Sequence, residues 1–294
     1  MNRRRFLTLT AAAMTLPGVA EARTRWSGIA LGAQAEITLT GPRPEAERAL
    51  EAVRAELARL EALFSLYQPT SELTRLNARG HLPRASAEMA ELLTLCDALH
   101  RLTGGRFDPT VQPFWRALAE GGAVATAERL VGWDRVRLTG AEIRLGAGQS
   151  LTLNGIAQGY VTDRVAALLR RAGFRDQLVS IGETRGDGGP WTVAVHDPNH
   201  GEVARRTLRN AAIATSSPGA LPLGTRTHIL DPRGQDAPRW STVSVEAANA
   251  ALADGLSTAL CLADAETART IATAMPDVHR ITLVDAHGDL ISIT

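Results

Sequence analysis

Two kinds of hydrophobic spacing divide the chain into predicted strands and helices. Between residues 26 and 40 apolar and polar positions alternate and β-branched residues are frequent, which is typical of a strand. Across residues 42–64 apolar positions recur every three or four residues, which is typical of a helix with one buried face. The same spacing predicts further helices at residues 87–102, 160–172, 247–261 and 266–275. Short apolar runs predict further strands at residues 135–138, 142–145, 177–181, 191–195, 206–208, 212–214, 227–230, 242–245, 280–284 and 290–293.

The order of these elements indicates the fold class. Strands and helices are mixed without a regular strand–helix–strand alternation, so a doubly wound parallel sheet is not expected. We expect an α+β protein with mixed sheets and flanking helices. The chain of 294 residues has no repeats and no low-complexity linker, and it is long enough to bury a sizeable core.

The first 22 residues have a different pattern. Three arginines at positions 3–5 precede a Phe-Leu pair, an apolar stretch follows at residues 9–19, and residues 20–22 have the small-x-small pattern of a signal peptidase site. The arginines resemble a twin-arginine signal, and the apolar stretch is too short to span a bilayer. We therefore predict a signal peptide at residues 1–22 and one domain at residues 23–294. The mature protein is expected to be periplasmic without stable membrane insertion; a basic N-terminal anchor is the alternative.

The charge and cysteine content indicate which classes of binding partner and which disulfide bonds to expect. The 32 basic and 31 acidic residues give a net charge of +1, and neither sign forms a long run. Aromatic residues make up 4% of the chain, so few platforms exist for stacking bases. We therefore expect no nucleic-acid binding. Cys96 and Cys261 stand among apolar neighbours in predicted helices, which favours two buried thiols but leaves a disulfide open.

Residues 154–159 form the first candidate ligand site. They join a predicted strand at residues 151–153 to the helix predicted at 160–172, and they contain two glycines. Such a junction exposes backbone N–H groups at a helix N-terminus, where a phosphate is favoured. Glycines in strand–helix turns also serve backbone conformations with positive φ and bind nothing. The spacing leaves both interpretations open.

Asp254 and Thr258 form a candidate metal site. They are four residues apart in the helix predicted at residues 247–261, so both side chains lie on one face. A carboxylate and a hydroxyl together suit Mg²⁺, which prefers oxygen ligands and accompanies phosphates. Taken alone, this spacing favours a structural interpretation, with Asp254 complementing the helix dipole and Thr258 partly buried.

His228 is a candidate general base. It flanks a predicted strand that ends at an Asp-Pro turn, where a side chain can point into a cleft. An imidazole there would titrate near working pH. The chain has seven histidines, and a lone histidine is more often structural. The hydroxyl-rich residues 215–217 invite a nucleophile hypothesis, but no Gly-x-Ser-x-Gly elbow surrounds them, so we interpret them as a ligand loop or a plain turn.

Six short segments carry a family resemblance. They are Phe64-Ser65-Leu66-Tyr67 with Ser71-Glu72-Leu73 and Leu76-Asn77; Gly105-Arg106-Phe107-Asp108-Pro109-Thr110-Val111 with Pro113; Asn154-Gly155-Ile156-Ala157-Gln158-Gly159-Tyr160 with Asp163; Ala214-Thr215-Ser216; Thr227-His228-Ile229-Leu230-Asp231-Pro232-Arg233; and Ala253-Asp254-Gly255-Leu256-Ser257-Thr258-Ala259-Leu260. Their order and spacing resemble the FAD:protein FMN transferase family, also called the ApbE family. Each motif alone is weak, but six in order with sensible gaps are specific.

The resemblance implies a fold, an activity and a role for each matching residue. It implies an ApbE-like α+β architecture resembling the T-fold, and Mg²⁺-dependent transfer of FMN from FAD to a threonine of a target flavoprotein, with release of AMP. His228 would be the base that frees the target hydroxyl. The Mg²⁺ ligands would be the side chains of Asp254 and Thr258 and the carbonyl of Gly155. The FAD site would be lined by Leu31, Tyr67, Arg106, Phe107, Asp108, Thr152 and Gln158.

Several positions depart from the family pattern. Thr152 stands where an acidic residue often precedes the central loop, and Gln158 replaces the usual Lys or Glu. Ala33 stands where a threonine is expected, and Gly182-Glu183 replaces a Gly-Gly pair. The central loop resembles a subgroup tied to nitrous-oxide respiration, which implies an acceptor that is an exported or membrane-bound flavoprotein.

Two other functions use the same residues. A metal-dependent FAD pyrophosphatase would pass FMN to water, although the aromatic Tyr67 resembles the transferases at that position. A non-catalytic flavin-binding protein is the third hypothesis, and the charges missing at Thr152 and Gln158 favour it.

Overall fold

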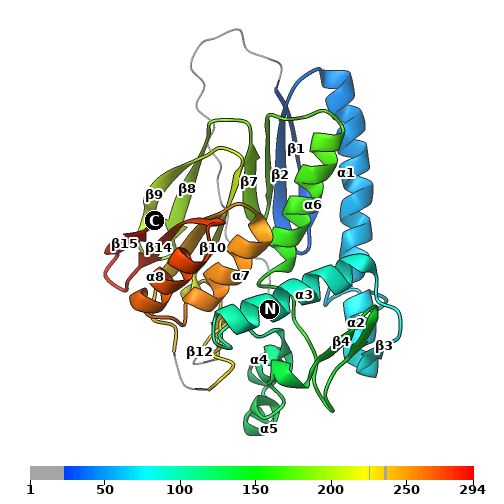
Figure 1. Ribbon diagram of the computed structural model, residues 1–294, viewed down its shortest axis with the longest axis vertical. Helices are drawn as coiled ribbons and strands as arrows, with labels where there is room; N and C mark the ends of the chain where they lie inside the picture. The colour runs from blue at the N-terminus through cyan, green and yellow to red at the C-terminus, as the bar shows by residue number, and fades with distance from the viewer. Residues whose placement is uncertain (1–22, 225, 235–236) are drawn as a thin grey trace.

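An eight-stranded antiparallel sheet forms the centre of the molecule (Figure 1). The computed structural model describes residues 23–224, 226–234 and 237–294. The strand order is β1-β2-β6-β7-β10-β13-β14-β15, and each neighbouring pair is antiparallel. These strands are β1 (Arg23–Ala30), β2 (Ala33–Thr40), β6 (Gln177–Ile181), β7 (Glu183–Asp187), β10 (Ala211–Ser216), β13 (Thr242–Ala247), β14 (Val278–Val284) and β15 (Leu290–Ile293).

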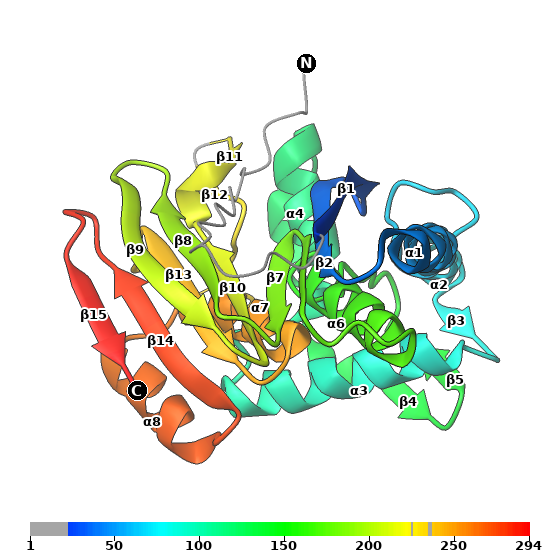
Figure 2. The same cartoon turned by 90° about the horizontal axis from the view of Figure 1, so that it is seen from above.

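Helices cover one face of this sheet, and the opposite face carries a hairpin (Figure 2). The helices on the covered face are α1 (Arg43–Phe64), α6 (Ala157–Arg171), α7 (Ala250–Leu260) and α8 (Ala265–Ala274), with α3 (Ala87–Leu102) packed outside α7. Successive side chains of a strand point to opposite faces of the sheet, so neighbouring residues show which face lies under the helices. Val179 belongs to the core under the helices, whereas its neighbour Leu178 packs against the hairpin. The hairpin consists of β8 (Trp191–Asp197) and β9 (Gly201–Leu208).

Two helices show how burial follows the sequence. α1 buries one stripe at helical spacing and carries ion-paired charges such as Arg43 and Glu47 on its exposed face. α7 buries ten of its eleven residues, and Thr258 is the partly exposed one. The sheet lies on one side of α7, and α6 and α3 contact it elsewhere. A helix enclosed in this way must be apolar or small on all sides, so a carboxylate within it needs a specific explanation.

A smaller lobe lies beyond the end of the sheet, at the bottom of Figure 1. Its elements are α2 (Glu72–Arg79), β3 (His81–Leu82), α4 (Gln112–Glu120), α5 (Val124–Glu128), β4 (Arg137–Thr139) and β5 (Glu142–Arg144). Near it lie the short strands β11 (Pro222–Leu223) and β12 (Arg226–Thr227). Single turns of 3-10 helix occur at Pro109–Val111, Trp133–Arg135 and Pro218–Ala220.

The α+β prediction is confirmed, since the helices are segregated to one face of an antiparallel sheet. The single strand predicted over residues 26–40 is wrong, because a turn at Leu31 and Gly32 divides it into β1 and β2. Leu31 has φ 49°, a left-handed conformation that its residue type does not signal. The strand predicted at residues 227–230 is also wrong beyond Thr227, where β12 ends. Cys96 and Cys261 are buried free thiols, as expected.

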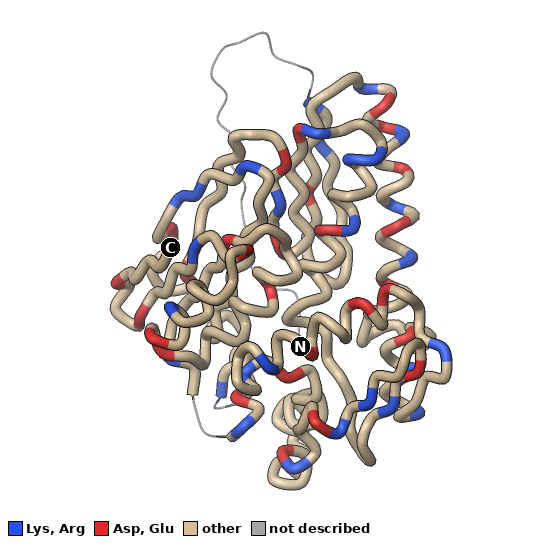
Figure 3. Tube along the Cα trace, in the orientation of Figure 1, with Lys and Arg blue, Asp and Glu red and all other residues tan. Residues whose placement is uncertain are grey.

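Charges of both signs are interspersed along the trace (Figure 3). No helix in the described part of the chain combines the length and apolarity that a membrane span requires. The predicted signal peptide at residues 1–22 lies outside the described residues.

Candidate active site

Two side chains, Asp163 from α6 and Asn249 directly before α7, cap the N-terminus of α7. The carboxylate of Asp163 accepts hydrogen bonds from the backbone N–H groups of Ala250, at 3.0 Å, and Ala251, at 2.9 Å. Asn249 caps the same end, because its Oδ1 accepts from the N–H of Leu252 at 2.9 Å. These N–H groups lack partners within the helix, so both caps stabilise this helix start. The position of every later residue in α7 follows from this anchor.

Gly155 and Gly159 lie in close contact with α7. A Cβ at position 159 would lie 2.3 Å from the carbonyl oxygen of Ala250, and a Cβ at position 155 would lie 2.8 Å from Oγ1 of Thr258. Neither glycine has the positive φ that the turn interpretation assumed. Both are needed because the segment before α6 and the first turn of α6 pass directly against α7. Gly155 and the side chain of Thr258 therefore lie in contact.

The backbone of the central loop differs from the prediction in two respects. Residues 151–153 form no strand, and the N–H and carbonyl of Leu151 bond to the side chain of Asn77 instead. The N–H groups of Ile156 and Ala157 donate to the carbonyl of Leu153. The N–H of Gly159 is also occupied, because it donates to the side chain of Asp254. With these three N–H groups already bonded, the loop has fewer free donors for a phosphate than an uncapped helix N-terminus would have.

Asp254 is a buried carboxyl with one protein donor. Its side chain is on the fifth residue of α7, and Oδ2 accepts a hydrogen bond from the N–H of Gly159 at 3.1 Å. Burial raises the pKa of Asp254 to about 7. The dipole interpretation does not fit this position, because Asp254 is beyond the first turn and bonds to α6.

Glu183, the first residue of β7, is a second buried carboxyl close to Asp254. Its Oε2 accepts from the N–H of Thr215 at 3.2 Å. Burial and the nearby charge of Asp254 raise the pKa of Glu183 well above its usual range. Neither carboxyl forms an ion pair with an arginine or histidine in the described part of the chain.

Hydroxyl groups complete the surroundings of Thr258. Oγ of Ser216 lies 2.8 Å from Oγ of Ser257 and 3.4 Å from Oγ1 of Thr258. Ser217 turns away from this group and bonds to Thr242. Thr215 and Ser216 are the last residues of strand β10, so the ligand loop or plain turn predicted at residues 215–217 is wrong for these two residues.

Gln158 lies over the turn between β6 and β7. A Cβ at Gly182 would come within 2.5 Å of the Gln158 amide, and Gly182 has φ 77°. Both its conformation and the space therefore require glycine at position 182. Gln158 thus contacts the residue that directly precedes Glu183.

His228 is held in one tautomer. Its Nδ1 lies 3.1 Å from the carbonyl oxygen of Pro218, so Nδ1 carries the proton and Nε2 is left as the acceptor. Its own N–H donates to the carbonyl of Leu221 at 3.2 Å. Burial lowers the pKa of His228, which keeps the ring neutral near pH 7. Pro218 is two residues from Ser216, which links His228 to the surroundings of Thr258.

The segment that carries His228 is attached to the smaller lobe by its own apolar cluster. Phe114 of α4 packs with Leu223 and Leu230 in that cluster. The guanidinium of Arg226 also lies over the ring of Phe114, 5.4 Å from its centroid. The position of His228 therefore depends on the contact between this segment and α4.

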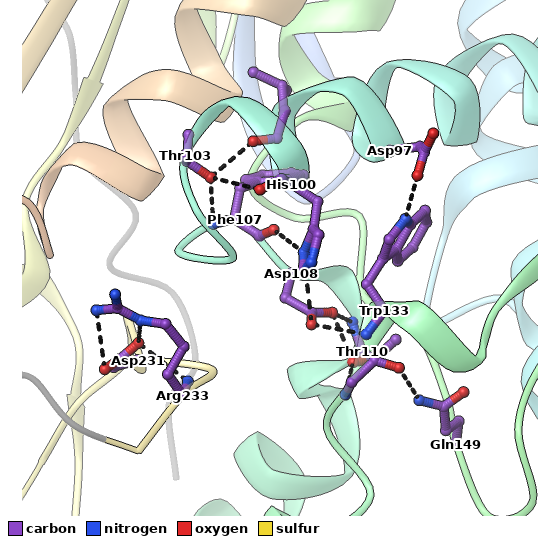
Figure 4. Close-up of polar contacts among 12 residues, drawn as sticks. Asp97, His100, Thr103, Phe107, Asp108, Thr110, Trp133, Gln149, Asp231 and Arg233 are labelled. Carbon is purple, nitrogen blue, oxygen red and sulfur yellow. Dashed lines mark hydrogen bonds and ion pairs between the residues drawn. The ribbon is translucent and has the colours of Figure 1, made fainter. Parts of the chain in front are cut away.

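The turn at residues 105–108 is organised by Asp108 (Figure 4). Its Oδ1 accepts from the N–H and the hydroxyl of Thr110, at 2.8 and 2.6 Å, and its Oδ2 accepts from the N–H of Trp133 at 3.0 Å. Nδ1 of His100 lies 3.8 Å from Oδ2. Burial raises the pKa of Asp108. These contacts show Asp108 as a support of the turn, in addition to the FAD role that the resemblance implies.

The remaining predicted FAD residues lie at several places. Phe107 is buried, and Arg106 bonds to the carbonyls of Thr103 and Leu262. The hydroxyl of Thr152 accepts from the N–H of Asn154. Leu31 is at the half-buried turn between β1 and β2, and the ring of Tyr67 is 71% exposed. No described contact joins these last two to the Asp254 site.

Glu183 was not identified from the sequence as a buried carboxyl near Asp254 and was treated only as a departure from a pattern. Its signal was an acidic residue directly after the apolar run at residues 177–181 and its glycine. The capping role of Asp163 was also missed, because its partners are 87 and 88 residues away in the chain.

Comparison with known proteins identifies the family. The ApbE family model matches residues 31–282. A FAD:protein FMN transferase of Haemophilus influenzae is 28% identical over 249 aligned residues, covering 73% of this chain and 72% of that protein. A FAD:protein FMN transferase of Rhodobacter capsulatus is 31% identical over 262 aligned residues, covering 80% of this chain and 50% of that protein.

Solved structures share the fold. The ApbE protein of Thermotoga maritima aligns with a TM-score of 0.82 and 23% identity, over 92% of this chain and 97% of that one. The flavin transferase ApbE of Vibrio cholerae aligns with a TM-score of 0.79 and 23% identity, over 93% and 97% of the two chains. The chain therefore belongs to the ApbE family and is an enzyme of the flavin transferase type.

Proposed function

We propose that this enzyme transfers FMN from FAD to a threonine hydroxyl of an acceptor flavoprotein, releases AMP and uses Mg²⁺. The observation that carries the proposal is the meeting of Gly155 and Thr258 beside the buried carboxyl of Asp254. FAD and a protein acceptor correspond to the activity named for the relatives. The threonine follows from the motif resemblance.

The residues at this place fit Mg²⁺. A carboxylate, a hydroxyl and a carbonyl are hard oxygen donors, which this ion prefers. Asp254 and Glu183 are buried without a cationic partner among the described side chains, and a buried carboxylate is costly unless a cation compensates it. The side chains of Asp254 and Thr258 and the carbonyl of Gly155 would hold the ion. When bound there, Mg²⁺ would neutralise charge on the diphosphate of FAD.

His228 supplies the proton transfer in this proposal. Its Nε2 accepts the proton of the acceptor threonine, and the threonine oxygen forms a bond to the phosphorus of the FMN half of FAD. The bond from that phosphorus to the oxygen of AMP breaks, and AMP leaves with the electron pair. The tautomer fixed by Pro218 and the lowered pKa both favour His228 as a base.

The acceptor belongs to the same compartment as the enzyme. The twin-arginine-type pattern of residues 1–22 supports a periplasmic enzyme, and an acceptor that is exported or membrane-bound. A fusion of residues 1–22 to a reporter, followed by cell fractionation, tests this part; a reporter retained in the cytoplasm would contradict it.

Intact-mass measurement of an acceptor domain tests the activity. After incubation with the enzyme, FAD and Mg²⁺, the acceptor should gain the mass of one FMN, and EDTA or Asp254→Ala should abolish the gain. The exposed His279→Ala on β14 serves as a control that should retain it. AMP release without a mass gain would indicate a pyrophosphatase. FAD binding without either product would indicate a flavin-binding protein.

Tyr67→Asn tests the choice of acceptor. The ring is 71% exposed, so its loss should leave stability within about 0.5 kcal/mol of the wild type. We expect more FMN and AMP to form from FAD without an acceptor, because water would then reach the phosphorus more easily. An unchanged rate of hydrolysis, followed by chromatography of AMP, would mean that Tyr67 does not control the acceptor.

A further inference from the structure

Glu183 lies between β10 and α6, two elements that pack against helix α7. Its side chain extends toward β10, where Oε2 accepts the N–H of Thr215 at 3.2 Å. Its backbone carbonyl accepts the hydroxyl of Thr162, on α6, at 3.3 Å. Thr215 is followed by Ser216, whose hydroxyl contacts Thr258. Glu183 therefore contacts β10 and α6, which both pack against α7, the helix that carries Asp254 and Thr258.

Glu183 and Asp254 accept fewer hydrogen bonds than the partly buried Asp163 and the buried Asp108. Asp163 accepts two backbone N–H groups and pairs with Arg185 at 3.1 Å. Asp108 accepts three hydrogen bonds. Glu183 and Asp254 each accept one hydrogen bond from the described residues, although they are only 7% and 3% exposed.

Glu72 is the nearest parallel elsewhere in the chain. It is 4% exposed, and its Oε1 accepts one N–H, that of Ser86, at 2.7 Å. It stands in the first turn of α2, however, where the helix dipole and free N–H groups favour a negative charge. Glu183 begins a strand and has no such compensation. A carboxylate accepts up to about four hydrogen bonds, so one oxygen of Glu183 and one of Asp254 remain available to a ligand.

We infer that Glu183 provides a second carboxylate to the cation site, so that this chain binds Mg²⁺ before FAD arrives. The inference rests on the proposed function, because it assumes the ion that Asp254 and Thr258 would hold. Two carboxylates balance the charge of one divalent cation, so the site does not depend on the diphosphate to neutralise it. The same cation removes the repulsion between the two buried acids.

Calorimetric titration of the FAD-free protein with MgCl₂ tests this inference without an activity readout. Glu183→Gln should weaken Mg²⁺ binding by about ten- to hundredfold, the range typical for groups that support a metal site. The matched control Glu72→Gln should bind Mg²⁺ within about twofold of the wild type, because its carboxyl is on α2. An unchanged Kd in Glu183→Gln would overturn the inference.

Thermal melting separates this role from a purely structural one. Without metal, Glu183→Gln should melt at or above the wild-type Tm, because the substitution removes one of two like charges. Added Mg²⁺ should raise the Tm of this variant by less than it raises the Tm of the wild type. A structural role would lower its Tm equally with and without Mg²⁺, and that result would overturn the inference. Glu183→Asp keeps the charge, but its side chain is one methylene shorter, so this variant should also bind Mg²⁺ more weakly. An unchanged Kd for Mg²⁺ in Glu183→Asp would overturn the inference even if Glu183→Gln does not fold.

The inference and the proposed function fail in different ways. A wild-type protein that binds no Mg²⁺ without FAD, yet transfers FMN only when Mg²⁺ is present, would overturn the inference and leave the function standing. Full FMN transfer by Asp254→Ala in the presence of EDTA would overturn the proposed function.

Discussion

Two buried acidic groups in this molecule differ in how their charge is compensated. Asp197, at the end of β8, accepts five hydrogen bonds, from the N–H groups of Asn199 and His200, the ring of His200, and the hydroxyls of Ser241 and Thr242. These donors lower the pKa of Asp197 to about 2. Asp254 accepts one hydrogen bond, and burial raises its pKa to about 7. A fully bonded carboxylate stabilises the fold, whereas an under-bonded one is available to a ligand.

The largest effect on activity is expected from Asp254→Ala. Under the proposed function, loss of the carboxylate should remove a ligand of the proposed Mg²⁺ ion and reduce FMN transfer by about a thousandfold or more, because a catalytic metal contributes several kcal/mol. Stability without metal should not fall sharply, since Asp254 bonds to one N–H. Transfer rates followed by acceptor fluorescence check this. Retention of a tenth of the wild-type rate would mean that the under-bonded carboxyl is not the functional one.

A smaller effect on activity is expected from His228→Ala. Loss of the base should lower kcat by about a hundredfold. In the wild type kcat/KM should fall only below pH 6.5, because burial lowers the pKa of His228, and this acid limb should vanish in the variant. His200→Ala is the matched control, since its ring bonds to the structural carboxylate of Asp197, and it should keep the rate. An acid limb that persists in His228→Ala would assign the titration to another group.

Asp197→Ala should affect stability and leave the activity of the folded protein unchanged. The substitution leaves the hydroxyl of Ser241 and the N–H groups of Asn199 and His200 without this acceptor, which costs about 3 kcal/mol. Urea unfolding measures this loss. If instead the variant folds normally and transfers poorly, the distinction between the two acidic groups is wrong.

The smallest expected effect is the pH dependence of the free energy of unfolding that the Asp197 carboxyl causes. The pKa of Asp197 is lowered in the folded protein, so its contribution is present above its ordinary value of 3.8 and is lost as the pH falls from about 4 to about 2. Unfolding free energies of the wild type should therefore fall more steeply in this window than those of Asp197→Asn. Parallel curves for the two proteins would show that Asp197 does not titrate as the geometry implies.

Features that depend on residue spacing within one element could be predicted from the sequence, whereas features that depend on contacts between distant parts of the chain could not. Helix α7 and the shared face of Asp254 and Thr258 follow from spacing within one element, and the prediction placed both. The turn at Leu31 was missed because its left-handed backbone is imposed by the hairpin and not by residue type. The role of Glu183 could not be predicted because its partner, Thr215, is 32 residues away.

Short elements were missed for a related reason. Helices α2, α4 and α5 have eight, nine and five residues, too few for a clear hydrophobic period. The neighbourhood of His228 was predicted as a strand because its composition is β-like, but Arg226 and Thr227 are the residues that pair there. The identity of His228 as a candidate base came from the motif, and its tautomer came from the carbonyl of Pro218.

Under the proposed function, the close contact of Gly159 with Ala250 would make Mg²⁺ binding and folding parts of one equilibrium. Its two sides come from segments about ninety residues apart, Gly155–Gly159 and Ala250–Thr258, so the site exists only after α6 and α7 have docked. A cation bound there selects the docked chain over the unfolded one, and at one hundred times its Kd it adds about 2.7 kcal/mol to stability. The Mg²⁺ concentration of the compartment would therefore set both the activity of this enzyme and the fraction of it that is folded.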